Sequence, residues 1–328
     1  MQDIIRPINR AALKRELTPE KRLRRTNKSD NDIYIVTSED SPQTMLEIGR
    51  LREVAFRHYG GGTGLSADID EFDTMNGGYR QLIVWSSREE QILGGYRFLC
   101  GSDVKMDLDG KPVLATSHLF NFSKSFLKDY LPYTVELGRS FVSLDYQATL
   151  GRSKGLFILD NLWDGLGALT VIDPTLKYFY GKVTMYNTYN VEARNMILYF
   201  LNLHFPDPDG LVRPIEPLET DTDRAKMETI FCCHNFKDNY KALNQEVRKL
   251  GFNVPPLVNA YMSLSPKMRA FGTAINREFG EVEETGILIA INEILEEKKK
   301  RHIETYLKEM EEPDFQLVKI MNVGWNVG

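Results

Sequence analysis

The sequence predicts an α/β fold in which helices flank a mixed, mostly antiparallel sheet, with a carboxyl-terminal helical and hairpin elaboration. Three observations favour this fold class. Short runs rich in β-branched and aromatic residues alternate with longer segments of helical periodicity. Two pairs of apolar runs are separated by short polar stretches, as in antiparallel hairpins. The chain has 328 residues, of which 42% are hydrophobic, and this is enough to bury a large core.

The chain begins with a predicted strand, helix and hairpin. Residues 32–38, DIYIVTS, are a short β-branched run. Ser41 and Pro42 then start a helix whose apolar residues keep helical spacing until the glycines at 60–62 stop it. RQLIVWSS and ILGGYRFLC follow as a hairpin around the polar stretch REEQ.

Strands and helices continue to alternate further along the chain. An insertion marked by glycine and aspartate, GSDVKMDLDGKP, precedes the strand YTVELGRSFVS, the turn LDYQATLGRSKG and the helix LFILDNLWDGLGAL. The strand KYFYGKVTMYN and the helix EARNMILYFLNLHF come next. Residues 206–222 are predicted to be a connection and residues 223–251 to be helical. The runs AFGTAIN and TGILIAIN then form a second hairpin, before a charged helix.

These elements suggest four parts. Residues 1–31 are a basic amino-terminal arm, 32–205 the core, 206–295 an elaboration that completes the sheet, and 296–328 a charged helix and tail. The arm is either solvated or a docking surface for an anionic partner such as an acidic carrier protein or a lipid headgroup.

Composition excludes several classes of protein. A net charge of −5 gives no general reason to expect a nucleic-acid partner. The three cysteines lack the spacing of a metal site, so no metal is expected. No apolar stretch has the length of a signal peptide core or of a spanning helix. We therefore expect a cytoplasmic protein, with peripheral contact at the inner face of the membrane as an additional expectation.

Glu136 is the first candidate catalytic residue, because it lies inside an apolar strand between Val135 and Leu137. A partly desolvated carboxylate has a raised pKa and accepts a proton more readily near neutral pH. Such a group suits a general base that deprotonates an amine during attack on a thioester. The alternative is a structural ion pair with Arg97 or Arg139.

A glycine- and cation-rich turn follows this strand directly and precedes an apolar helix. Unpaired backbone amides at the start of a helix bind phosphate groups, and glycine lets the backbone approach the ligand. By itself the turn is weak evidence, but the strand carboxylate upstream strengthens it. We therefore expect an acyl group carried on a phosphate-containing arm, held by the turn residues Gly151, Arg152, Ser153, Lys154 and Gly155.

The order of these features resembles the GNAT acyltransferases, whose pyrophosphate loop is written Q/R-x-x-G-x-G/A. Residues 152–157 match its arginine and first glycine, but Phe157 occupies the last small position. This departure favours a phosphopantetheine donor on acyl carrier protein, with acyl-CoA as the alternative donor. No permanently bound cofactor is implied.

Seven ordered motifs extend the resemblance to one branch of this superfamily. LREVAFR, DIDEFD, QLIVW, ILGGYR, ELGRSFV, LWDGLGAL and YFYGKVTMY look like the ornithine-lipid and glycine-lipid N-acyltransferases, a branch sometimes labelled haemolysin and distantly related to the acyl-homoserine lactone synthases. The resemblance implies that the family's active-site residues correspond here to Arg52, Phe56, Asp70, Asp73, Arg97, Glu136 and Arg139.

Within this resemblance, several roles stay open. The four acids of ADIDEFDT either pair with Arg52, Arg57 or Arg97 or hold the substrate ammonium. Arg97 or Arg139 binds the amino-acid carboxylate, or both pair internally. Backbone amides at Phe141, Val142 and Ser143 are expected to polarise the thioester carbonyl. The aromatic residues Tyr178, Phe179, Tyr180 and Tyr186 either line an acyl tunnel or pack in the core.

The resemblance implies an enzyme that transfers a β-hydroxyacyl group from acyl carrier protein to the amine of an amino acid, with glycine the closest match, in aminolipid synthesis. Ornithine as the acceptor, a CoA-dependent acetyltransferase and a lactone synthase are the enzymatic alternatives. A module that binds a carrier protein or a membrane surface without catalysis is the alternative of another class.

Overall fold

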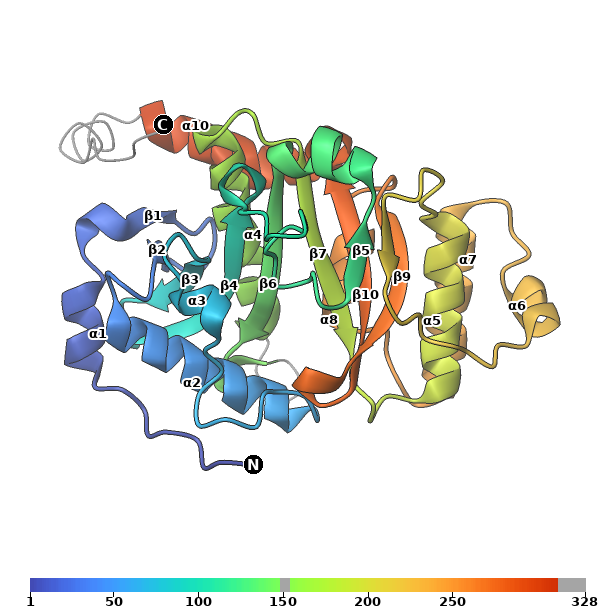
Figure 1. Ribbon diagram of the computed structural model, residues 1–328, viewed down its shortest axis with the longest axis horizontal. Coiled ribbons are helices and arrows are strands. Elements are labelled where there is room, and N and C mark those ends of the chain that lie inside the picture. Colours follow the sequence, from blue (N-terminus) through green and yellow to red (C-terminus); the bar gives the residue numbers. More distant parts are fainter. Residues whose placement is uncertain (148–153, 312–328) are drawn as a thin grey trace.

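The structure is a computed structural model that describes residues 1–147 and 154–311. Its centre is an eight-stranded sheet in the order β1-β2-β3-β4-β6-β7-β10-β9 (Figure 1). Neighbouring strands are antiparallel except for β6 and β7, which are parallel. The strands are β1 Arg22–Arg25, β2 Asp32–Val36, β3 Arg80–Ser86, β4 Gln91–Cys100, β6 Thr134–Val142, β7 Tyr178–Met185, β9 Arg269–Asn276 and β10 Val282–Ala290.

Helices cover both faces of this sheet, which confirms the predicted fold class. The helices are α1 Arg10–Glu16, α2 Pro42–His58, α3 Glu71–Thr74, α4 Lys154–Ile172, α5 Val191–His204, α6 Arg224–Ile230, α7 Phe236–Lys249, α8 Pro256–Met262, α9 Glu296–Lys299 and α10 Thr305–Glu311. A small second sheet pairs β5 Phe120–Phe122 with β8 Val212–Pro214. Among the described residues, no helix has both the length and the apolar character that crossing a bilayer requires.

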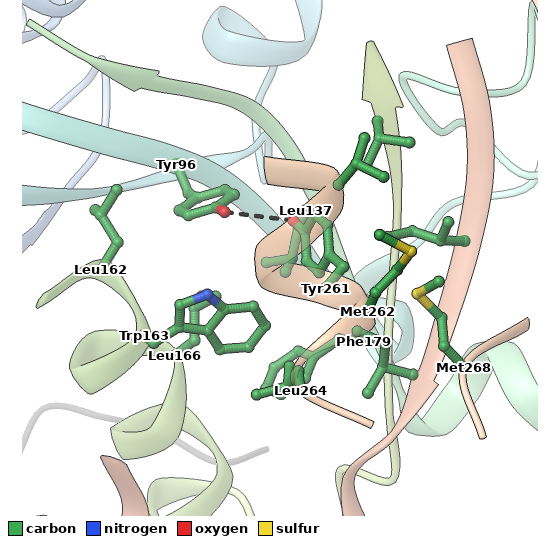
Figure 2. Close-up of a cluster of buried hydrophobic side chains, with 14 of the residues drawn as sticks. Tyr96, Leu137, Leu162, Trp163, Leu166, Phe179, Tyr261, Met262, Leu264 and Met268 are labelled. Carbon is green, nitrogen blue, oxygen red and sulfur yellow. Dashed lines mark hydrogen bonds between the residues drawn. The ribbon is translucent and has the colours of Figure 1, made fainter. Parts of the chain in front are cut away.

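The larger core lies on one face of the sheet, where α4, α5 and α8 pack against the strands and α7 packs against α5. Trp163 of α4 makes edge contacts with Phe179 of β7 and Tyr261 of α8, and the hydroxyls of Tyr96 and Tyr261 lie 3.3 Å apart (Figure 2). Phe179 therefore packs in the core, as does Tyr180 on the opposite face. Neither lines the cavity described below, so core packing, one of the two alternatives for this aromatic strand, is observed for these two residues.

The opposite face carries the site. There α1 and α2 pack against β2 and β3, while the segment between β4 and β6 packs with β5 and β8 against β7, β9 and β10. Side chains of adjacent residues in a strand point to opposite faces, so Leu137 joins the large core while Glu136 points to the site face. The alternation in the strand sequence thus aims a carboxylate away from the larger core.

The amino-terminal arm and the charged helical segment near residue 302 pack into the fold more closely than the sequence indicated. The basic arm contains α1 and the edge strand β1, whose Arg24 is buried and donates to the carbonyl oxygens of Asp164 and His302. The run EEKKKRH was expected to be a solvated helix face, yet His302 is buried and its Nδ1 lies 2.7 Å from an Asp164 oxygen. The predicted helix at 223–251 is interrupted, and α7 starts anew with Asn235 as its cap.

Candidate active site

Glu136 lies on β6 beside β7, where its Cα pairs with that of Tyr180. Its side chain is 2% exposed, and both carboxylate oxygens accept hydrogen bonds from hydroxyl groups. Thr116 donates to Oε1 at 2.7 Å, and the Tyr79 hydroxyl donates to Oε2. In the described chain neither Arg97 nor Arg139 forms an ion pair with Glu136, so the structural ion pair considered for it is absent there.

Burial raises the pKa of Glu136, and the hydrogen bonds from Tyr79 and Thr116 together with the nearby charge of Arg97 lower it, with a net upward shift. The Tyr79 hydroxyl is itself fixed, because it accepts a hydrogen bond from the Ala115 amide at 2.9 Å. A carboxylate oxygen has two lone pairs, so each oxygen of Glu136 can still accept a further proton donor. The arrangement suits a base whose orientation is fixed before substrate arrives.

A cavity of about 630 Å³ opens beside Glu136. Its volume is typical of a small-molecule site. Part of its wall comes from the segment 111–118, which precedes β5, and part from the strands that carry the charged side chains. Those charged and polar lining residues include Asp70, Arg97, Thr116, Glu136, Arg139 and Lys182.

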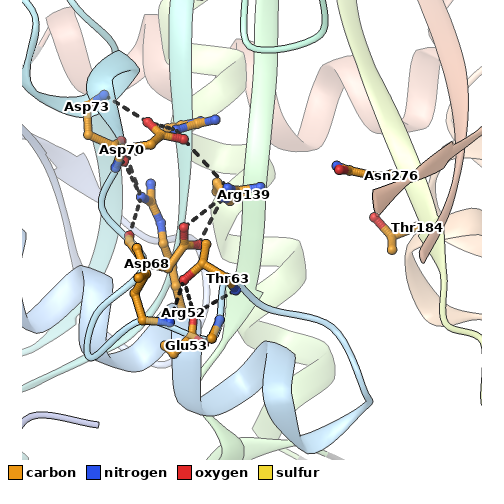
Figure 3. A network of polar contacts seen from close by, with 12 residues as sticks. Arg52, Glu53, Thr63, Asp68, Asp70, Asp73, Arg139, Thr184 and Asn276 are labelled. Carbon is orange, nitrogen blue, oxygen red and sulfur yellow. Dashed lines mark hydrogen bonds and ion pairs between the residues drawn. The ribbon is translucent and has the colours of Figure 1, made fainter. Parts of the chain in front are cut away.

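Three arginines and three aspartates form a network at one end of this cavity (Figure 3). The residues come from distant parts of the chain, since Arg52 lies on α2, Arg97 on β4 and Arg139 on β6. The fully buried Arg52 pairs with Asp73 at 3.1 Å. Burial alone would raise the pKa of Asp73, but Arg52 and Arg97 lower it overall. Pairing of the acids with arginines, one of the two alternatives for this loop, is therefore observed.

The acidic segment is held in a single turn of helix. Asp70 caps α3 by accepting from the Asp73 amide, and the Asp73 side chain accepts in return from the Asp70 amide. Arg97 Nη1 donates to both oxygens of Asp70 at 2.7 Å. Arg57 is not part of this network, because it pairs with Glu53 on its own helix.

Arg139 occupies a bulge in β6. Two residues, Arg139 and Ser140, lie opposite the single residue Tyr96 of β4, and Arg139 has the left-handed φ of 48°. A bulge bends its strand and redirects the side chain. The Arg139 Nε lies 2.9 Å from an Asp68 oxygen, and the guanidinium lies 4.2 Å from the centre of the Phe279 ring. Phe279 in turn packs edge-on against Phe56 of α2, so Phe56 supports the cavity wall from behind.

The strands β6 and β7 separate just before the bulge (Figure 1). Their ladder ends with the pair Leu137 and Gly181, so residues 138–142 have no partner on β7. The Ser143 amide donates to the Leu93 carbonyl at 2.8 Å and is therefore not available to a thioester carbonyl, contrary to expectation. That role stays a prediction for the amides of Phe141 and Val142.

The predicted phosphate-binding turn is only partly described. Gly151, Arg152 and Ser153 lie outside the described residues, whereas Lys154 and Gly155 form the first turn of α4. Phe157, the residue that departs from the family pattern, is exposed, and Lys28 of the basic arm lies 5.2 Å from the centre of its ring. The arm thus reaches the start of α4.

Several residues of the site were not found from the sequence. Tyr79 and Thr116 lie in loops whose sequence shows no special pattern, and their roles depend on contacts with Glu136 that cross the fold. Lys182 and Glu284 form a buried ion pair between β7 and β10. A lysine and a glutamate in predicted strands were the available signal, since charges are rarely buried without partners. Among the described residues, no three His, Cys, Asp or Glu side chains are grouped to hold a metal.

Known proteins share this chain's sequence over nearly its whole length. Residues 51–153 match a family model described as an acetyltransferase (GNAT) domain. A glycine N(alpha)-acyltransferase from Phocaeicola vulgatus is 65% identical over 309 residues, covering 94% of this chain and 95% of that protein. This chain belongs to the GNAT N-acyltransferases.

A second relative of this N-acyltransferase supports the same assignment. The glycine N(alpha)-acyltransferase from Bacteroides thetaiotaomicron is 63% identical over 308 residues, covering 94% of this chain and 91% of that protein. A solved CoA-dependent acyl-homoserine lactone synthase with SAM and isopentyl-CoA is far more distant, at 11% identity and a TM-score of 0.36, over 82% of this chain and 86% of that one.

Proposed function

We propose that this N-acyltransferase transfers a β-hydroxyacyl group from the thioester of acyl carrier protein to the amine of glycine. The observation that carries the proposal is Glu136, a buried carboxylate with a raised pKa on the wall of a cavity that is also lined by arginine and lysine side chains. The choice of glycine is supported by the two relatives, which are named for glycine. The expected product is an N-acylglycine, a precursor of an aminolipid.

The reaction joins the amine nitrogen to the thioester carbon. The glycine ammonium first gives a proton to Glu136, directly or through one water. The free amine attacks the carbonyl carbon, the C–N bond forms and the C–S bond breaks. The second amine proton passes to the departing sulfur, so the products are the amide and the carrier thiol.

The donor is proposed to reach this cavity from the start of α4. Backbone amides at the first turn of a helix bind phosphate. Beyond Leu137 and Gly181, β6 and β7 are no longer paired, and we propose that the donor arm passes between these two strand edges from the start of α4 to the cavity. Exposed basic residues of the arm, including Arg10, Arg15 and Lys28, match the acidic surface of a carrier protein. Neutralising Arg10 and Arg15 tests this docking, because it should raise KM for acyl carrier protein and leave KM for acyl-CoA unchanged.

Replacing Glu136 with glutamine tests the central assignment. Glutamine keeps the shape and most hydrogen bonds but cannot accept the proton, so turnover should fall by at least about a hundredfold. Release of carrier thiol, measured with β-hydroxyacyl carrier protein and glycine, gives the rate, and a thermal melt verifies the fold. A Glu136→Gln rate near that of the wild type at neutral pH would show that another group is the base.

A panel of acceptors tests the choice of substrate. Glycine should be acylated in preference to ornithine, serine and alanine, as read from the mass of the product. Preference for ornithine would change the acceptor but keep the chemistry. Failure to acylate any amino acid with either donor would exclude the proposed function.

A further inference from the structure

Lys182 is a partly buried lysine on the wall of the active-site cavity, and it has no part in the acyl transfer proposed for Glu136. It comes from β7, its side chain is 12% exposed, and it forms an ion pair with Glu284 on β10. Glu284 also accepts from Thr184 at 3.2 Å and from Asn276 at 3.1 Å. Figure 3 shows Thr184 and Asn276 on other strands, apart from the arginine network. Glu284 is therefore held in place by several strands.

The ammonium group of Lys182 has donors left for a ligand. A lysine carries three N–H donors, and among the described residues its hydrogen-bond acceptor is Glu284. The described lining of the cavity includes Lys182 and Asn276 but not Glu284. The cation is thus bordered by its carboxylate partner on one side and by the cavity on another. A buried N–H donor of this kind favours a negatively charged partner.

Each of the two arginines that line the cavity contacts two carboxylates, although the network as a whole shares three aspartates among three arginines. Arg97 faces both Asp70 and Asp73, and Arg139 faces both Asp68 and Asp70. Lys182 faces one carboxylate, and that carboxylate accepts two further hydrogen bonds. A substrate carboxylate in this cavity therefore meets less competition at Lys182 than at either arginine.

The parallel register places Lys182 at a suitable separation from the base. Glu136 pairs with Tyr180, and Lys182 lies two residues further along β7 on the same face. From the spacing and rise of strands, the Cα atoms of Glu136 and Lys182 are roughly 8 Å apart. An α-amino acid has its amine and carboxylate on one carbon, so a molecule with its amine at Glu136 presents its carboxylate to the space between these side chains.

From this geometry we infer that Lys182 binds the carboxylate of the amino-acid acceptor and that Glu284 is a positioning residue that orients Lys182. This inference rests on the proposed function and extends it. It makes the enzyme selective for amines with an adjacent carboxylate, and it leaves the arginine network to hold the loop.

The test compares glycine with glycinamide, which has the same amine but no carboxylate. We expect Lys182→Met to reduce the ratio of kcat/KM for glycine to that for glycinamide by about tenfold to a hundredfold, because a charge-assisted hydrogen bond is lost. Both kcat/KM values come from the same preparation, so their ratio does not depend on the fraction of active enzyme. The ratio can therefore be compared between variants even if part of the protein is misfolded. Lys182→Arg keeps the charge and should retain most of the preference.

The matched control is Lys177→Met, since Lys177 is an exposed lysine directly before the same strand, against the Tyr133 ring. It should leave the ratio unchanged. A Lys182→Met ratio within about twofold of the wild type would overturn the inference while glycine acylation by the wild type still stands. A wild type that acylates no amino acid would remove the proposed function together with it.

The role of Glu284 has its own measurement. Glu284 raises the pKa of Lys182 against the lowering by burial, so Glu284→Gln should let Lys182 lose its proton at a lower pH. KM for glycine should then begin to rise at a lower pH than in the wild type, and KM for the donor should not follow. An unchanged pH profile would show that Glu284 does not act through Lys182. The charged or titratable groups of the described chain that act on this pair include Arg139, Arg97, Glu136, His118, Tyr180 and Tyr186.

Discussion

The hydroxyl groups around Glu136 set its proton affinity. Burial raises the pKa of the carboxyl, and the hydrogen bonds that Tyr79 and Thr116 donate lower it by stabilising the charged form. An arginine in direct contact would have lowered the pKa much further and made a weak base. Hydroxyl partners therefore orient the carboxylate while leaving it basic enough to accept a proton.

Replacing Tyr79 with phenylalanine should move the pH dependence of the reaction in a defined direction. The variant loses a donor that favours the charged form, so the pKa of Glu136 rises further. The base is active when deprotonated, so the acidic limb of kcat/KM against pH, measured with glycine and a saturating donor, should shift to higher pH.

A matched control for this variant is Tyr96→Phe. Tyr96 is also buried, but it lies in the core on the other face of the sheet, beside Tyr261. Its substitution should leave the acidic limb in place. Equal shifts in the two variants would mean that the limb does not report Glu136.

At the level of elements, α4 is held by an unusually close contact with the carboxyl-terminal helix. A Cβ placed on Gly167 would lie 2.3 Å from the carbonyl oxygen of His302. Glycine is needed here because two backbones approach each other, although it weakens a helix interior. This packing fixes the carboxyl-terminal half of α4 against the rest of the fold.

Gly167→Ala should therefore destabilise the protein, against the usual gain for alanine in a helix. Alanine normally stabilises a helix interior by up to about 1 kcal/mol relative to glycine. Overpacking against rigid backbone should outweigh this gain and lower the free energy of unfolding by about 2 kcal/mol, as measured by denaturant titration. A stabilised variant would show that the carboxyl-terminal helix moves aside freely.

For the whole molecule, both ends of the chain close on α4. Arg24 of the edge strand donates to backbone oxygens of α4 and of the π-helical turn Lys300–Glu304. The Asn27 amide donates to Asp164, which also faces His302. The amino-terminal arm is therefore a structural part of the fold as well as a basic surface.

Deleting residues 1–28 should unfold the protein instead of only weakening donor binding. The deletion removes the edge strand β1 and the buried side chains of Leu13, Leu17 and Leu23. Burial of each leucine contributes about 1.5–3 kcal/mol, so the loss for all three is roughly 4.5–9 kcal/mol, comparable with the stability of a typical domain. Circular dichroism and a thermal melt measure this loss. A cooperative melt near that of the wild type would contradict it.

Much of the architecture could be predicted from local patterns. The strand and helix periodicities located β2, β3, β4, β6, β7 and the helices α2, α4 and α5 close to their observed bounds. The short elements β1, β5, β8 and α3 were missed, because elements of three or four residues carry little periodic signal. Glu136 and the arginines were located through their motifs, and both the parallel register and the bulge at Arg139 required the folded chain.

The sequence by itself determined the kind of chemistry: a carboxylate placed in an apolar strand, arginines in neighbouring strands and a helix start suited to phosphate. Alternation along a strand and the cost of burying a charge make these inferences local. The tertiary structure alone decided which charges neutralise each other. Ion pairs join residues far apart in the chain, so only the folded arrangement shows the arginines paired with aspartates and Lys182 left facing the cavity.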